Sequence, residues 1–430
     1  MLQKNHDLHF TNRAGRTYSR QWRQLCLNAV IPLLVGIGWQ QSALAFEFTP
    51  LIDDLPYGAS GGLTFAPKGH YVYGTFLLGG IYSKGEVFQV KLPPKGEVGW
   101  SISDVKTVAN FNGRNGEYPF SGVIVDSVGN IYGTASQGGG KNQNGLVFQI
   151  THENGKKVRK ILKTFGDPAD GVYPFPKLLL DPAGNIYGVT RYGGQGGAGV
   201  VFQLAPPVAG QTEWGFQTLV DFDVANGASP EAGLVMGNNG KLYGTTLGGG
   251  LHKSGTVFEL TPPLAGQTAW GFQTLVDFDG SNGSHPLSEL TWGADGRLYG
   301  TTTSDGENGG GTVFQLTPPA AGEDVWNFST IKAFRGAQWE GPTGGLTAAA
   351  DGSLYGTTVQ EGKYNAGRVF KLTPPAVGKT VWKFQTIVDF DGSNGRNPEA
   401  SLTWGPDGNL YGTTFWGGKL GLGTFFKITP

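Results

Sequence analysis

Short apolar runs alternate with glycine-rich polar turns along the chain from residue 46 onward. One stretch shows the pattern well: an apolar run at residues 288–293 is followed by an Asp-Gly turn and a second run at 297–302 that is rich in β-formers. After a glycine-rich loop, residues 311–317 alternate, a Pro-Pro pair interrupts them, and residues 328–334 form a fourth run. The pattern therefore predicts four short strands, the first two joined as a hairpin.

The same pattern recurs seven times at nearly constant spacing. An aliphatic residue followed by Tyr-Gly returns at steps of 59, 55, 56, 56, 56 and 56 residues. The seven tyrosines are Tyr73, Tyr132, Tyr187, Tyr243, Tyr299, Tyr355 and Tyr411. A fixed period in this range is typical of solenoids and propellers, and four strands per period favour a propeller, because the coils of a β-solenoid are shorter. We therefore predict an all-β, seven-bladed β-propeller of four-stranded antiparallel blades, forming a single domain over residues 46–430.

The two ends of the repeat region complement each other. The last repeat ends at residues 424–429, which correspond to a third strand, so the seventh blade lacks its outer strand. Residues 46–53 match the fourth strand of the preceding repeat at 384–389. We expect this N-terminal strand to complete the last blade, because an unpaired strand edge exposes backbone donors and acceptors.

Several repeated side chains are interpreted as structural. Trp214, Trp270, Trp326 and Trp382 recur just ahead of the fourth strand, where we expect large rings to pack between blades. Each tyrosine of the Tyr-Gly motif is expected in the second strand, with its hydroxyl partnered locally. The glycine after it, such as Gly300, is expected to allow a close backbone approach between blades.

These motifs resemble those of a known family. Tyr-Gly-Thr-Thr, the Gly-Gly-x-x-x-x-Gly loop, Thr-Val-Phe and Leu-Thr-Pro-Pro resemble the tandem GloVer repeats of secreted bacterial proteins. Members are called choice-of-anchor because they carry different C-terminal anchors. The resemblance covers essentially the whole chain after residue 45 and implies the repeat fold and export, whereas the family implies no established reaction. The sequence departs from the pattern in that a repeat runs up to Pro430, where a sorting tail would follow.

Residues 1–45 have the features of a secretory signal peptide. Five basic residues precede an apolar run of 15 residues at 25–39, and the small-residue site Ala43-Leu44-Ala45 follows. The run contains Pro32 and is shorter than the roughly 20 residues that span a bilayer. We predict cleavage before Phe46 and export to the periplasm or the extracellular space, with no membrane span afterwards; an uncleaved membrane anchor is the alternative.

Charge and cysteine content restrict the partners. Without residues 1–45 the chain has 27 basic and 32 acidic residues and a net charge near −5, so nucleic acid is not an expected partner. The one cysteine, Cys26, lies ahead of the predicted cleavage site, which excludes disulfides and thiolate metal sites from the remaining chain. We expect a monomer.

Three inter-blade loops carry near-copies of one acidic sequence, at residues 221–227, 277–283 and 389–395. Two carboxylates and an amide oxygen suit calcium, but Asp, Asn and Gly are also common turn residues. We expect no cofactor and keep calcium as the alternative. His252 and His285 fall on the same predicted face without the spacing of a zinc site, so no metal site is predicted.

The loops around the channel mouth differ between blades at the two positions ahead of a shared loop proline. This proline is Pro119, Pro174, Pro230, Pro286, Pro342 or Pro398 in successive repeats. An asymmetric binding site would produce this difference, and so would neutral drift in exposed loops. Aromatic side chains that occur in single copies on these loops suit a glycan or another cell-envelope component, and they should be partly exposed. The candidate ligand-binding residues are Tyr118, Tyr173, Arg191, Tyr192, Trp339, Glu340, Arg396 and Trp416.

Two other functions stay open. In a polysaccharide lyase, Arg396 would neutralise a uronate carboxylate and His285 would take the neighbouring proton, while Tyr118 or Tyr173 would protonate the leaving oxygen. A structural scaffold would instead bind other proteins through its blade edges, with no specialised channel mouth.

Overall fold

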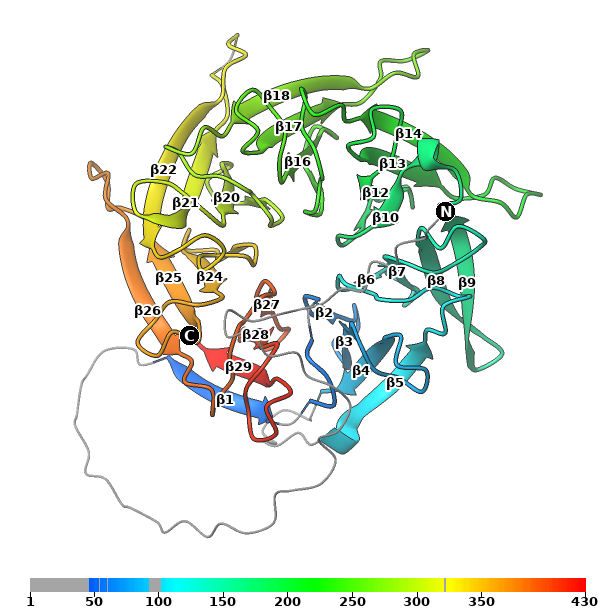
Figure 1. The fold of residues 1–430 in the computed structure, drawn as a ribbon, viewed down its shortest axis with the longest axis horizontal. Helices are drawn as coiled ribbons and strands as arrows, with labels where there is room; N and C mark the ends of the chain where they lie inside the picture. The colour runs from blue at the N-terminus through cyan, green and yellow to red at the C-terminus, as the bar shows by residue number, and fades with distance from the viewer. Residues whose placement is uncertain (1–45, 54, 60, 93–101, 321) are drawn as a thin grey trace, which may run out of the picture. The chain divides into compact units, whose positions relative to one another are not determined.

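The computed structural model describes residues 46–53, 55–59, 61–92, 102–320 and 322–430. Phe46–Pro430 forms one compact unit of seven antiparallel sheets arranged in a ring (Figure 1). The predicted all-β, seven-bladed propeller is confirmed. The helical elements in the described part of the chain are two 3₁₀ turns, η1 (Ile102–Asp104) and η2 (Pro168–Asp170). The signal peptide predicted for residues 1–45 lies outside the described residues.

Each blade has four strands in antiparallel order, numbered here from the channel outward. The first strands of blades 1 to 7 are β2 (Thr64–Phe65), β6 (Ile124–Val125), β11 (Leu179–Leu180), β15 (Val235–Met236), β19 (Thr291–Trp292), β23 (Thr347–Ala348) and β27 (Thr403–Trp404). The second strands are β3 (Tyr71–Phe76), β7 (Ile131–Ala135), β12 (Ile186–Tyr192), β16 (Leu242–Thr246), β20 (Leu298–Thr302), β24 (Leu354–Thr358) and β28 (Leu410–Thr413).

Two outer strands complete each blade. The third strands are β4 (Glu86–Lys91), β8 (Leu146–Glu153), β13 (Val200–Ala205), β17 (Thr256–Thr261), β21 (Gly309–Thr317), β25 (Arg368–Thr373) and β29 (Phe425–Thr429). The fourth strands of blades 1 to 6 are β5 (Val105–Asn110), β9 (Lys156–Thr164), β14 (Gly215–Asp221), β18 (Gly271–Asp277), β22 (Asn327–Arg335) and β26 (Lys383–Asp389). Blade 3 has an additional short strand, β10 (Val172–Pro174), which pairs with β12.

Blade 7 takes its fourth strand from the other end of the chain. β1 (Glu47–Ile52) pairs antiparallel with β29. The ring of Phe48 packs against Phe390 of blade 6 and Phe426 of blade 7, with centroid separations of 6.0 and 5.5 Å. A hydrogen bond of 3.0 Å from the Thr403 hydroxyl to the carbonyl of Leu63 joins blade 7 to blade 1 on the inner side. The N-terminal strand therefore closes the ring, as predicted.

The repeated rings join neighbouring blades. Trp382 of blade 6 packs edge-on against Tyr299 of blade 5, with ring centroids 5.8 Å apart. At the closure, Phe46 takes the place of this tryptophan and lies 6.3 Å from Tyr355 of blade 6. The hydroxyl of Tyr299 donates to Asp295 at 2.8 Å. The tryptophans thus pack between blades as predicted. The tyrosines lie in the second strands as predicted, and Tyr299 has the expected local partner for its hydroxyl.

The glycine after each tyrosine has a different role from the predicted one. Gly300 is paired with Phe314 of the neighbouring strand. A Cβ on Gly300 would lie 2.4 Å from Cζ of Phe314 and 2.7 Å from Cδ2 of Leu290, both in the same blade. The glycine therefore makes room for a ring within its own blade, and the prediction of a close backbone approach between blades is wrong.

The first strand of each blade is shorter than the apolar run predicted for it. Of residues 288–293, Thr291 and Trp292 pair with β20. The residues before them follow the wall of the channel, where side chains alternate between two sides because extended backbone has a period of two. Leu287 and Glu289 are partly exposed, whereas Ser288 is buried.

Candidate binding site in the central channel

All seven blades contribute to one cavity of about 760 Å³, which lies along the axis of the ring. This volume is within the range of about 300–1,000 Å³ that is usual for ligand pockets. The lining includes the first and third residues after each loop proline, or its equivalent in blade 1, and we call these residues the inner wall. The described first positions are Phe120, Phe175, Glu231, Leu287, Thr343 and Glu399, and the third positions are Gly62, Gly122, Lys177, Gly233, Glu289, Gly345 and Ser401.

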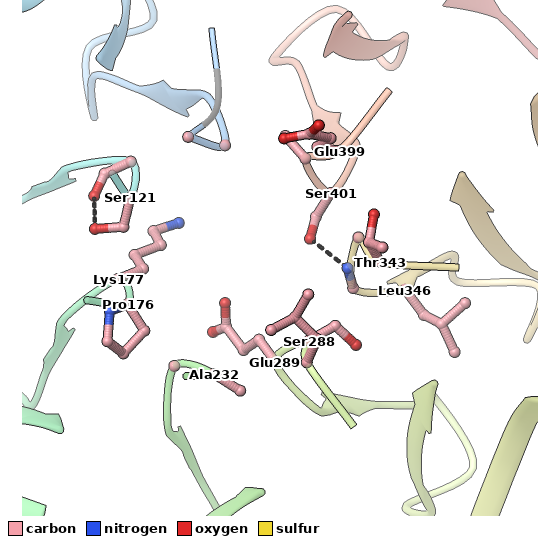
Figure 2. A pocket seen from close by; sticks show the side chains of 18 of the residues that line it. Ser121, Pro176, Lys177, Ala232, Ser288, Glu289, Thr343, Leu346, Glu399 and Ser401 are labelled. Atoms are coloured by element: carbon pink, nitrogen blue, oxygen red, sulfur yellow. Dashed lines mark hydrogen bonds between the residues drawn. The ribbon is translucent and has the colours of Figure 1, made fainter. Parts of the chain in front are cut away.

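Two opposite charges approach each other across a glycine of the inner wall. Figure 2 shows Lys177 of blade 3 and Glu289 of blade 5 extending into the cavity. Gly233 of blade 4 lies between them, and a Cβ on it would be 3.1 Å from the Lys177 carbonyl oxygen and 3.3 Å from Cδ of Glu289. Burial raises the pKa of Glu289, and the charge of Lys177 opposes that rise. The missing side chain of Gly233 thus leaves room for Glu289.

Arg191 offsets the charge of Glu231. Nε of Arg191 is 2.7 Å from Oε1 of Glu231, although the two atoms are not aligned as a hydrogen bond. The guanidinium also lies over two rings, 5.7 Å from the centroid of Phe175 and 5.1 Å from that of Tyr192. Burial raises the pKa of Glu231, and Arg191 opposes the rise. This contact connects two sequence-predicted residues, Arg191 and Tyr192, to the inner wall.

Glu399 of blade 7 has a different environment. Burial raises the pKa of its carboxyl group to about 7. No ion pair involves Glu399 within the described residues. Near neutral pH this group is therefore divided between its protonated and ionised forms, so it can donate a hydrogen bond to a ligand hydroxyl or accept one from it.

Aromatic rings form the apolar part of the cavity lining. Phe120 and Phe175 lie against each other with centroids 4.1 Å apart. Trp339 also lines the cavity, and its ring is 5.2 Å from that of His285. The cavity thus combines flat apolar surfaces with carboxyl, hydroxyl and ammonium groups.

The sequence-predicted residues fall into separate groups around the ring. Tyr173 lies with Tyr192, their ring centroids 6.2 Å apart, and His285 lies with Trp339. Elsewhere, the backbone N–H of Arg396 donates to the carbonyl of Trp416 at 2.7 Å.

Two further predicted residues have local partners. Tyr118 adjoins the ion pair of Lys84 with Glu117. Glu340 accepts a hydrogen bond of 2.8 Å from the N–H of Ala337.

The five aromatic side chains predicted to be partly exposed are partly exposed in the structure. Tyr192, Trp339 and Trp416 are 41 %, 41 % and 48 % exposed, and Tyr118 and Tyr173 are half-buried. Of the eight predicted ligand-binding residues, Trp339 lines the central cavity. Arg191 reaches it through Glu231.

The residues predicted for a lyase have other partners. Nδ1 of His285 is 2.8 Å from Oγ of Ser284, whose hydroxyl also donates to Asp305. Burial lowers the pKa of His285, and Asp305 opposes the change. Nε of Arg396 donates to Asn397 at 3.1 Å. Within the described residues, no hydrogen bond, ion pair or ring contact joins His285 to Arg396 or to the predicted tyrosines.

The acidic loops use their oxygen atoms to close turns. Oδ1 of Asp279 accepts hydrogen bonds from the N–H groups of Ser281 and Asn282, at 2.9 and 3.2 Å. Oδ1 of Asp277 accepts from the N–H of Leu251 at 2.8 Å. Across the described ranges, no group of three or more His, Cys, Asp or Glu side chains is placed to hold a metal ion. The calcium alternative stays a prediction.

Sequence reasoning missed the charged residues of the inner wall. It singled out the two positions ahead of the loop proline, whereas the charged residues of the cavity lining stand at the first and third positions after it. The sequence does contain a signal for these residues. Every repeat has Leu or Val at the fourth position after the loop proline or its equivalent, whereas the third position is glycine in some repeats and Lys177, Glu289 or Ser401 in others. Alternation of shared and differing positions in an extended segment indicates one packed side and one open side.

Fold and cavity together define a seven-bladed propeller with a ligand-sized axial channel. The chain belongs to the Gloeobacter/Verrucomicrobia repeat family, whose model matches residues 59–291 and 288–430, and this confirms the resemblance seen in the motifs. No curated protein matches the chain. No helix in the described ranges is both long and apolar enough to cross a membrane.

Similar solved structures share little sequence with the chain. A proposed oxidoreductase (glucose dehydrogenase) from Thermus thermophilus is 14 % identical, with a TM-score of 0.45, and the match covers 90 % of this chain and 100 % of that one. A proposed 6-phosphogluconolactonase from Bacteroides uniformis is also 14 % identical, with a TM-score of 0.49, and the match covers 80 % of this chain and 88 % of that one.

Proposed function

We propose that the protein is an exported binding protein that takes a neutral glycan into its central channel. The observation that carries this proposal is the lining of the cavity, where the rings of Phe120, Phe175 and Trp339 accompany the carboxyl groups of Glu289 and Glu399. Sugar rings place their C–H faces on flat apolar surfaces, and their hydroxyls form hydrogen bonds with a few precisely placed polar groups.

The charges of the inner wall favour a neutral ligand over an anionic one. Arg191 offsets Glu231, and Lys177 opposes the effect of burial on Glu289, so Glu399 leaves an excess of negative charge at neutral pH. A polyanionic polysaccharide would bring like charges into a poorly hydrated site, which is costly. A neutral glycan requires hydrogen-bond partners alone, and the wall supplies both donors and acceptors. These charges favour the binding function over the lyase.

Export is proposed from the sequence of residues 1–45, with their basic start, apolar run and small-residue site. A cell-envelope or extracellular glycan is the ligand class that an exported protein meets.

A glycan array tests the proposed function. The purified protein is screened against neutral, amino and uronate-containing glycans, and the ultraviolet absorbance of unsaturated uronate is followed in the uronate samples. We expect selective retention of neutral glycans and no absorbance change. Binding confined to uronates, or an absorbance increase that His285→Ala abolishes, would contradict the proposal and support the lyase.

A further inference from the structure

Blade 5 departs from the repeat where its fourth strand ends. In blades 3, 4 and 6 the last two residues of this strand and the two that follow are Val-Asp-Phe-Asp, at residues 220–223, 276–279 and 388–391. Blade 5 has Lys332-Ala333-Phe334-Arg335 in their place. The backbone register is kept, since Ala333 pairs with Thr312 as Asp277 pairs with Thr256. Lys332 thus replaces a valine, and Ala333 and Arg335 replace the two aspartates, which changes the formal charge of the four residues from −2 to +2.

The substituted residues line a cleft of about 340 Å³ between blades 5 and 6, separate from the central channel. Arg368 at the start of β25 also lines the cleft. The ammonium of Lys332 is 4.9 Å from the ring centroid of Phe384, and the guanidinium of Arg368 is 5.6 Å from the same centroid. Two cations therefore converge on one ring, and Arg335 adds a third at the exposed rim.

The cleft has more positive than negative charge. Glu361 is the one carboxylate among the described residues that line it, and its Oε2 is 2.8 Å from Nη2 of Arg368. Neither Lys332 nor Arg335 has an ion pair in the described part of the chain. Nε of Arg368 is buried without a hydrogen-bond partner. Three cations and one carboxylate leave a formal charge of +2 and an unused donor.

The other blades show what the substitution removes. Oδ1 of Asp221, Asp277 and Asp389 accepts a hydrogen bond from a backbone N–H of the loop between strands two and three, at 2.8, 2.8 and 3.0 Å. Ala333 cannot supply this acceptor. A bound anion would bring acceptor oxygens to a place where the repeat otherwise has a carboxylate.

Blade 2 provides an internal contrast. Lys163 occupies the strand position of Lys332 and likewise lies over a phenylalanine of the next blade, 3.9 Å from the centroid of Phe216. Lys163, however, forms an ion pair with Asp170. Lys163 is thus paired with a carboxylate of the turn that connects blades 2 and 3. Lys332 has no ion pair in the described residues, although its charge acts on Glu361 of blade 6.

We propose that Lys332, Arg335 and Arg368, which together we call the basic cleft, bind a tetrahedral oxyanion, either phosphate or sulfate, free or as an ester on a sugar. The guanidinium groups present several donors in a fixed fork, and the ammonium contributes a compact charge, a combination suited to oxyanions. This site is independent of the glycan proposed for the central channel.

The repeat itself supplies the test variant. Ala333→Asp combined with Arg335→Asp restores residues that blades 3, 4 and 6 already carry, so we expect the variant to fold. Calorimetric titrations with inorganic phosphate, inorganic sulfate and glucose 6-phosphate are made at constant ionic strength, with glucose as the uncharged control. Because each variant removes a charge-assisted donor for the anion or adds like charge beside it, we expect at least about tenfold weaker anion binding in this variant and in Lys332→Ala. Lys163→Ala, the matched control, should bind like the wild type.

The titrations also separate the sources of the anion. Equal affinity for phosphate and glucose 6-phosphate would support recognition of the oxyanion alone, and tighter binding of the ester would support an esterified sugar in the same cleft. Failure of all three anions to bind the wild type, or wild-type affinity in both Lys332→Ala and the double variant, would overturn the proposal.

Discussion

The strands of each blade and the inner wall of the channel differ in how closely the seven repeats agree. The third-strand phenylalanine is fully buried in six blades, with 0 % exposure at Phe148, Phe202, Phe258, Phe314, Phe370 and Phe426. The third position of the inner wall, by contrast, holds glycine, lysine, glutamate or serine. A side chain enclosed by neighbours must fit them, whereas one facing an open cavity need not. The regular part of the molecule is therefore the fold, and the irregular part is where we place the function.

Removal of β1 should cause the largest loss of folding stability in the regular part of the molecule, the blades. A chain that begins at Gly58 loses the β1–β29 pairing and the contacts of Phe48, and it leaves Phe426 uncovered. Burial of one large apolar side chain contributes about 1.5–3 kcal/mol, and each hydrogen bond adds about 1 kcal/mol, so we expect a loss of several kcal/mol or aggregation through the open edge. Thermal unfolding and size-exclusion chromatography measure both effects. An unchanged Tm would show that the strand is not needed for closure.

Replacing one glycine in each region by alanine compares the two regions directly. Gly300→Ala places a Cβ 2.4 Å from Phe314, and overpacking of this kind costs about 1–3 kcal/mol. Gly62→Ala on the inner wall meets no atom within 4 Å and should change the free energy of unfolding by less than about 0.5 kcal/mol. Urea denaturation of both variants measures the difference. Equal losses would contradict the division between packed and open positions.

Trp339→Ala should weaken glycan binding at least about tenfold, because a ring in the centre of an interface typically contributes about 2 kcal/mol or more. Its Tm should change little, since the ring is 41 % exposed. Tyr364→Ala is a suitable control, because Tyr364 is 52 % exposed and does not line the cavity. Lost stability with unchanged affinity would make Trp339 a structural residue. Tyr173→Ala tests the separate pair of Tyr173 and Tyr192 in the same way.

Glu399 should make stability depend on pH. Its pKa rises from 4.5 to about 7 on folding, so the folded state favours the protonated form. This contribution to stability is complete below about pH 4.5 and is lost as the pH rises through about 7. Glu399→Gln should therefore reduce the loss of stability between about pH 5 and pH 8, measured by chemical denaturation. Glu231 and Glu289 have pKa values raised in the same direction, so some pH dependence should remain. If the free energy of unfolding had the same slope against pH in Glu399→Gln and in the wild type, Glu399 would not be the source of this pH dependence.

Sequence reasoning was most successful where the chain repeats itself. The tyrosines, the interblade tryptophans and the closing strand follow from period and register. It failed at Gly300 because a repeated position does not reveal which neighbour occupies the space beside it. It failed again at Lys177 and Glu289, which lie in blades 3 and 5 and approach each other across Gly233 of blade 4, which has no side chain. Such proximity depends on tertiary structure and cannot be derived from spacing.

Entry of the ligand into the central channel is tested most directly by filling the cavity. Gly62→Trp adds a large ring on the inner wall, where a Cβ would have no atom within 4 Å, and Gly166→Trp adds the same ring in the loop after β9, where the surroundings are equally open. Each variant is titrated calorimetrically with the neutral glycan that the array selects. We predict at least about tenfold weaker binding for Gly62→Trp, wild-type affinity for Gly166→Trp, and an unchanged Tm for both. Wild-type affinity in Gly62→Trp would contradict binding in the channel.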